Sequence, residues 1–146
     1  MFNKNIMKLT INLAQNTSNL EVPVASVVAI DNEIISFSDN RIERDKKEWY
    51  HAEFLAIEKA LQKLGVKYLD KASIYVTLEP CILCSALLDK IRIKEIFFGA
   101  YNLQQASLTK CLNLFPYLVL NTTIIGGLYD KNCFKLIENC FRNLRK

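Results

Sequence analysis

Glycine, proline, histidine and tryptophan are all scarce in this chain of 146 residues, which has four, three, one and one of them. So few glycines and prolines exclude a flexible linker, and the sequence shows no internal repeat or low-complexity tract. We therefore expect one domain over residues 1–146, which is the length of an ordinary domain. Because His51 is the single imidazole, a metal site has to draw its other ligands from other residue types.

Long apolar runs are absent as well. No stretch is long enough to span a bilayer, and residues 1–14 lack the continuous apolar core of a secretory signal peptide. These absences predict a cytoplasmic protein that does not act at a membrane. The five cysteines are an odd number in a chain without an export signal, which argues against a disulfide framework.

The net charge of the chain is small, but its positive residues are unevenly distributed along the sequence. The formal net charge is +4, and the hydrophobic fraction of 51% is enough for a substantial core. Cations gather in one predicted loop and near the end of the chain, at Arg41, Arg44, Lys46, Lys47, Arg142, Arg145 and Lys146. This pattern has two interpretations, a solvated surface or contact with a polyanion such as RNA.

Hydrophobic periodicity predicts alternating helices and strands. Residues 38–49 are polar and read as an irregular segment. Alternation of this kind favours an α/β fold, a three-layer α/β/α sandwich with helices on both faces of a mixed five-stranded sheet. The expected helices cover 7–15, 51–64, 81–90, 103–112 and 131–144, and the expected strands cover 22–30, 33–37, 73–78, 93–99 and 121–125.

Two short motifs each stand at the start of a predicted helix, His51-Ala52-Glu53 and Pro80-Cys81-Ile82-Leu83-Cys84. Both helix starts can face one crevice at the strand ends, where open α/β sheets bind ligands. The two cysteines are three positions apart, so their sulfurs share a helix face, and a helix N-terminus favours thiolates. With His51 they supply three zinc ligands and leave the fourth position to water, as in catalytic zinc sites.

Glu53 completes the candidate site. A zinc-activated water acts as a nucleophile when a nearby group takes its proton and passes protons on to the substrate and the leaving group, and a carboxylate beside the metal can do this. Residues two apart do not share a helix face, so this role requires His51 at the irregular first position of its helix.

Taken singly, each motif has an ordinary explanation. C-x-x-C is often a redox pair or half of a structural zinc site, a lone histidine often caps a helix, and a glutamate in a first turn often serves the helix dipole. The order H-x-E followed by P-C-x-x-C is, however, the signature of zinc deaminases.

The sequence resembles the cytidine-deaminase-like superfamily and, within it, the bacterial tRNA adenosine deaminases. The resemblance implies hydrolytic deamination of adenosine to inosine at the wobble position of a tRNA anticodon. It also implies one Zn²⁺ per subunit, an arginine tRNA as partner and a homodimer. The matching text covers nearly the whole chain, at 21–24, 40–41, 51–53, 75–81, 98–100 and 141–142.

The resemblance assigns roles position by position. His51, Cys81 and Cys84 are expected to bind zinc, and Glu53 is expected to be the catalytic acid and base. The expected contacts to the target base come from Asn40, Leu78 and Val24, and those to the RNA from Arg41, Phe141, Arg142 and Arg145. For Asn40 taken alone, turn formation is an equally common role.

Three departures from the family pattern bear on substrate recognition. Ala25 stands where the family usually has glycine, Trp49-Tyr50 precede His51, and residues 101–107 form a shorter turn without glycine. Two alternatives therefore stand beside the leading hypothesis. One is a deaminase of a free nucleobase or nucleoside, of guanine or cytosine type. The other is a non-catalytic zinc-containing RNA-binding module, against which Glu53 argues.

Overall fold

The computed structural model describes residues 1–103 and 106–144. Its centre is a sheet with the strand order β2-β1-β3-β4-β5. β1 pairs antiparallel with β2 and β3, whereas β3, β4 and β5 run parallel. The strands are β1 (Ala25–Ile30), β2 (Glu33–Asp39), β3 (Ser73–Leu78), β4 (Glu95–Ala100) and β5 (Thr123–Ile125). The predicted mixed five-stranded sheet is confirmed.

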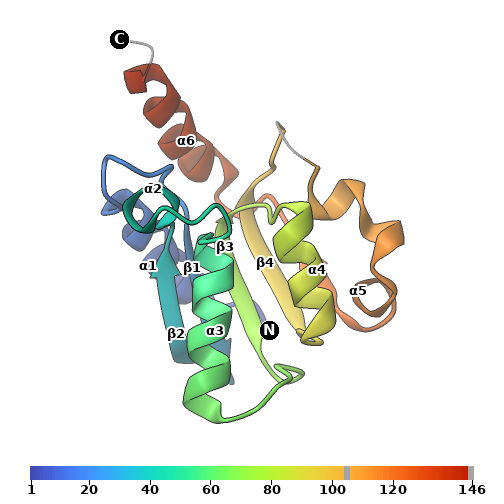
Figure 1. Cartoon of the computed structure of the whole chain (residues 1–146). Coiled ribbons are helices and arrows are strands. Elements are labelled where there is room, and N and C mark those ends of the chain that lie inside the picture. The colour runs from blue at the N-terminus through green and yellow to red at the C-terminus, as the bar shows by residue number, and fades with distance from the viewer. Residues whose placement is uncertain (104–105, 145–146) are drawn as a thin grey trace.

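Helices cover both faces of this sheet (Figure 1). They are α1 (Lys4–Gln15), α2 (Ile42–Asp45), α3 (Ala52–Leu64), α4 (Ile82–Lys90), α5 (Pro116–Asn121) and α6 (Asp130–Leu144). α3 and α4 pack on one face, and α1 and α6 lie on the other, with the far end of α6 extending beyond the sheet. This is the three-layer α/β/α sandwich that the alternating pattern predicts.

Side chains that alternate along the central strands build a core on each face. In β3, Ile74 and Val76 pack in the cluster formed with α3 and α4, whereas Tyr75 packs with residues of α1. β4 repeats this pattern, since Ile96 and Phe97 belong to opposite clusters. Strands that are buried on both faces have no polar face to show, which is why their sequences read as continuous apolar runs.

The segment after β4 differs from the prediction. A helix over 103–112 is wrong: the described residues form 3₁₀ turns at Leu108–Lys110 and Leu112–Leu114, and then α5. Leu108 is fully buried and its N–H donates to the carbonyl of Pro80, so contacts with a distant segment fix this path. α5 is absent from the sequence-based expectations, although Pro116 in its first turn is a favoured helix start.

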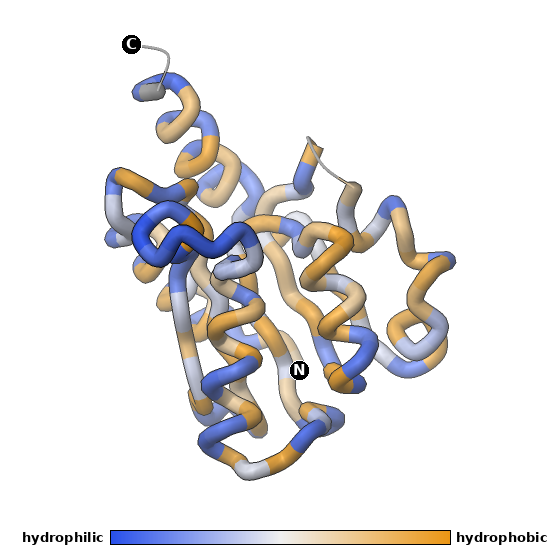
Figure 2. Tube along the Cα trace, in the orientation of Figure 1, coloured by the Kyte–Doolittle hydropathy of each residue, from blue (hydrophilic) through white to orange (hydrophobic). Residues whose placement is uncertain are grey.

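Elements near the other end of the chain also differ from the prediction: α1 begins at Lys4 and not at residue 7, and β2 ends at Asp39 and not at residue 37. β1 begins at Ala25 and not at Val22, because Pro23 has no N–H to donate and the N–H of Val24 turns back to the carbonyl of Val22. The irregular segment 38–49 contains the one-turn helix α2, and Figure 2 shows this region as strongly hydrophilic. No helix in the described part of the chain combines the length and the apolar composition needed to cross a bilayer.

Candidate active site

Two helix starts lie together at the end of the sheet where β3 finishes (Figure 1). His51 is the residue just before α3 and Cys81 the residue just before α4, and both have extended backbone conformations. Neither residue is therefore part of the regular helix, which frees its side chain from helical spacing. Cys84 follows in the first turn of α4. The irregular position that the role of Glu53 requires for His51 is present.

The three predicted ligands face one another. The imidazole Nδ1 of His51 lies 3.5 Å from the sulfur of Cys81 and 3.5 Å from that of Cys84. A zinc ion about 2.0 Å from nitrogen and about 2.3 Å from sulfur, at tetrahedral angles, separates two such ligand atoms by about 3.5 Å. All three ligand atoms lie within 4.8 Å of one another. The donor set therefore fits Zn²⁺ in chemistry and in spacing.

The two thiols differ in acidity. A hydrogen bond from Cys84, helped by the imidazole of His51, lowers the pKa of Cys81 to about 4. The hydrogen bond to Cys81, together with burial, raises the pKa of Cys84. The hydrogen bond with Cys81 also raises the pKa of His51. The lowered pKa of Cys81 favours its thiolate form, which is the form that binds a metal ion, and a bound metal ion would displace the proton of Cys84.

Glu53 lies in the first turn of α3, two positions after His51, and is almost completely buried. Burial is the main cause that raises the pKa of its carboxyl group, and the positive charge of His51 opposes that rise. A carboxyl group with a raised pKa beside an open metal position accepts a proton more readily than an ordinary carboxylate, which suits a group that takes up a proton and gives it back.

A cavity of about 550 Å³ opens from the metal-ligand cluster toward α6. Its volume lies within the usual range for small-molecule sites. The lining includes His51, Glu53 and Cys81, and also five further residues that the sequence analysis proposes, which are Val24, Asn40, Leu78, Phe141 and Arg142. Arg41 is not among the lining residues, and Arg145 lies outside the described residues.

Asn40 ties two parts of the cavity wall together. Its side-chain oxygen accepts the N–H of Ala52 at 2.9 Å, and its side-chain N–H donates to the carbonyl of Val22 at 3.1 Å. The first contact satisfies an N–H at the start of α3, beside the ligand His51. Asn40 therefore positions the metal site as well as lining the cavity.

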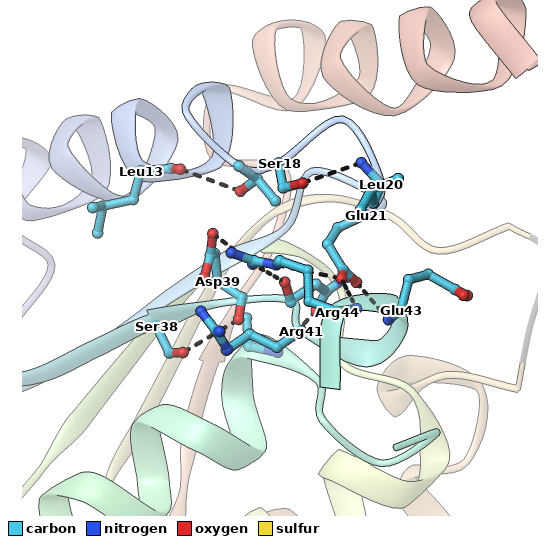
Figure 3. Close-up of polar contacts among 12 residues, drawn as sticks. Leu13, Ser18, Leu20, Glu21, Ser38, Asp39, Arg41, Glu43 and Arg44 are labelled. Carbon is cyan, nitrogen blue, oxygen red and sulfur yellow. Dashed lines mark hydrogen bonds and ion pairs between the residues drawn. The ribbon is translucent and has the colours of Figure 1, made fainter. Parts of the chain in front are cut away.

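The cations of the predicted loop are mostly paired within the protein. Figure 3 shows Arg44 reaching the buried carboxylate of Glu21 and the carboxylate of Asp39, at 3.4 and 3.1 Å. Glu21 also accepts the N–H groups of Glu43 and Arg44, which holds α2 in place. Arg41 pairs with Asp45 at 2.9 Å but stays 41% exposed. Of the two arginines, Arg41 is the one accessible to a polyanion.

The sequence motifs did not predict several of the residues that line the cavity. Phe134 and Ile137 on α6 line the cavity with Phe141, at the i, i+3 and i+7 spacing of one helix face. That apolar stripe is visible in the sequence, but nothing in it says which surface it covers. Glu138 on the same helix also lines the cavity and pairs with Arg142 at 2.6 Å.

A mixed α/β sandwich that brings a His-Cys-Cys set and a buried glutamate to one cavity has the architecture of a zinc-dependent hydrolytic deaminase. The model of the cytidine and deoxycytidylate deaminase zinc-binding region matches residues 2–100. The chain belongs to this family of zinc-dependent enzymes.

Comparison with individual proteins shows which members of the family this chain resembles. The chain is 36% identical over 126 residues to the tRNA-specific adenosine deaminase of Aquifex aeolicus, covering 86% of this chain and 83% of that one. A solved structure from a study of A-to-I editing by tRNA:A34 deaminases is 27% identical, with a TM-score of 0.83 and coverage of 92% and 99%. Guanine deaminase of Bacillus subtilis is 28% identical, with a TM-score of 0.66 and coverage of 78% and 70%.

Proposed function

We propose that this enzyme deaminates adenosine to inosine at the wobble position of a tRNA anticodon. The observation that carries the proposal is the fit of His51, Cys81 and Cys84 to zinc beside the buried carboxyl group of Glu53. The similarity to tRNA-specific adenosine deaminases over most of both chains supports the choice of substrate. A tRNA substrate supports our inference that the enzyme acts in the cytoplasm.

Each residue of the cluster has a distinct task in the proposed reaction. His51, Cys81 and Cys84 would hold a zinc ion, which would supply an activated water as the nucleophile. Glu53 would take one proton from the attacking water and deliver it to the ring nitrogen of adenine. It would then take the second proton of that water and deliver it to the amino group, which leaves as ammonia while the oxygen becomes the carbonyl oxygen of inosine. Val24 and Leu78 enclose the target base, and Asn40 contacts it with the amide hydrogen not used on Val22.

The RNA contacts lie around the mouth of the cavity. Arg142 lines it and has a 69% exposed side chain, and Phe141 lies beside it on α6. A phosphate can compete for the guanidinium of Arg142, and a splayed base can stack on Phe141. Arg41 adds an exposed cation from the segment around α2. Arg145 remains part of the proposed surface on sequence grounds alone.

We also propose that the chain acts as a homodimer. Large apolar side chains are exposed on α4 and α5, at Leu83, Val119 and Leu120. Exposed apolar side chains of this size support an interface with a second copy of the chain. Sedimentation should give twice the chain mass of 16.8 kDa. Leu120→Glu should lower the sedimentation mass to that of the monomer, whereas Leu9→Glu on α1 should leave it unchanged. A wild-type protein that sediments as a monomer would contradict the proposed dimer.

The experiment that tests the proposed function compares RNA and free bases as substrates. The protein is incubated with anticodon stem-loops that carry adenine at the wobble position, with arginine and other anticodons, and with free adenine, guanine and cytosine. We expect inosine in the RNA, most of all with an arginine anticodon. Turnover of a free base without any inosine in RNA would overturn the proposal in favour of a free-base deaminase.

A matched pair of variants tests the RNA surface. Arg142→Ala should raise the KM for the stem-loop about threefold to tenfold, since a phosphate contact is lost. Lys131→Ala removes an exposed cation from the other end of α6 and should leave the KM unchanged. An equal effect of both substitutions would show that only net charge matters and would contradict a specific contact.

A further inference from the structure

Glu79 is a buried carboxylate that lines the cavity between two parts of the active site. It follows the cavity residue Leu78 and precedes Pro80 and the zinc ligand Cys81. Only 2% of its surface is exposed, and no ion pair in the described ranges involves it. A buried charge without a cation has to be satisfied by hydrogen bonds, so its donors indicate what it holds.

Those donors come from both sides of one loop. One carboxylate oxygen of Glu79 accepts the N–H of Asn102 at 3.1 Å. The other accepts the N–H of Thr109 at 2.8 Å and also the hydroxyl of Thr109. We name residues 101–103 the first arm and residues 106–109 the second arm. A single side chain thus fastens the two arms at a fixed separation.

Each arm also touches the catalytic site. Tyr101, Asn102 and Leu103 of the first arm line the cavity. In the second arm, Ser107 pairs with Cys81 in an isolated β-bridge, flanked by hydrogen bonds from Ile82 to Ala106 and from Leu108 to Pro80. The arm that forms the cavity wall is therefore held in register with a zinc ligand through Glu79.

We propose that Glu79 is a positioning residue that sets substrate affinity by fixing the first arm as a wall of the cavity. This inference rests on the proposed function for its substrate. Glu79 does not reach the reacting atoms in this role; it acts through the backbone of Asn102 and Thr109. Its removal should therefore weaken substrate binding and leave the chemical step and the zinc content unchanged.

Glu79→Gln is the sharpest perturbation. The glutamine keeps the size of the side chain but turns one acceptor oxygen into an NH₂ group, which then faces an N–H donor. Leaving a buried donor without a partner destabilises the arrangement that holds the first arm. We expect the KM for the stem-loop to rise about tenfold, which corresponds to about 1.4 kcal/mol, with kcat within about twofold of the wild type.

A milder variant and a matched control accompany it. Thr109→Val removes the hydroxyl donor but keeps the N–H, and we expect a rise in KM of about threefold. Thr122→Val removes a comparable hydroxyl, which donates to the carbonyl of Ile93 at 2.7 Å away from the cavity, and should leave KM unchanged. Thr109→Val also covers the case in which Glu79→Gln fails to fold.

Hydrogen exchange of the backbone amides gives a readout that does not depend on activity. The amides of Asn102 and Thr109 should exchange faster in Glu79→Gln, while zinc stays at one ion per chain. Faster exchange with an unchanged KM would overturn the proposal, as would loss of zinc or a fall in kcat alone. A wild type without activity on RNA would refute the proposed function instead, and KM would then be measured on the base that it does deaminate.

Discussion

Replacement of Glu53 by glutamine tests the proton transfer on which the proposed chemistry depends. The substitution preserves the volume of the side chain and its place in the cavity but removes the group that carries protons. General acid–base catalysis of this kind contributes about 10²–10⁴-fold, which is about 2.7–5.5 kcal/mol of barrier. Because one carboxyl group handles every proton transfer in the scheme, we expect kcat to fall by about 10³-fold or more.

The structure also predicts what this substitution leaves intact. Burial raises the pKa of Glu53, so its charged form is disfavoured in the folded protein and a neutral amide should not lower the melting temperature. Zinc, measured by elemental analysis, should stay at one ion per chain, since Glu53 is not among the three ligands. The assay is inosine formation in the stem-loop, with Glu58→Gln on the exposed side of α3 as the matched control. Activity within tenfold of the wild type at full zinc content would refute the assigned role.

Three further predictions concern stability. Cys84→Ala should abolish zinc binding and lower the melting temperature as far as a chelator lowers that of the wild type, whereas Cys111→Ala should keep the metal; an equal zinc content in both contradicts the ligand set. Leu88→Ala, at a fully buried position of α4, should lower the free energy of unfolding, measured by urea titration, by about 2–5 kcal/mol. A loss below about 1 kcal/mol would contradict close packing at this position. Burial raises the pKa of Cys133 to about 11 and that of Tyr75 above its ordinary value. As the pH rises, these two side chains therefore stay protonated to a higher pH in the native state than in the unfolded state. The melting temperature should therefore hold up to about pH 9 and fall as the pH rises through about 11, and a rise over that interval would contradict the sign.

Some elements could be predicted from the sequence because neighbouring residues alone determine where they begin and end. The strand Ser73–Leu78 was predictable at both ends, because a β-branched and aromatic run stands there. The end of α3 was predictable from Gly65, which takes the left-handed conformation and donates its N–H to Leu61. The metal-ligand cluster was predictable because its members stand in two motifs with fixed internal spacing.

The parts of the structure that the sequence did not predict depend on contacts between residues far apart in the chain. The second arm and the turns after it follow an irregular path because Leu108 inserts into the core and its backbone pairs with Pro80, and no local pattern encodes that pairing. Likewise, Arg44 resembles the other loop cations in the sequence, yet Glu21 neutralises it from a separate segment. Glu79 shows the same limit, since its donors lie 23 and 30 positions away along the chain.

X-ray absorption at the zinc edge tests most directly whether this chain holds a catalytic metal. The account predicts one zinc ion per chain with two sulfur neighbours at about 2.3 Å and two nitrogen or oxygen neighbours at about 2.0 Å, one of them the imidazole of His51 and the other an exchangeable water. A purified protein without zinc, or a zinc ion with a third sulfur or a second protein nitrogen in its coordination shell, would contradict it.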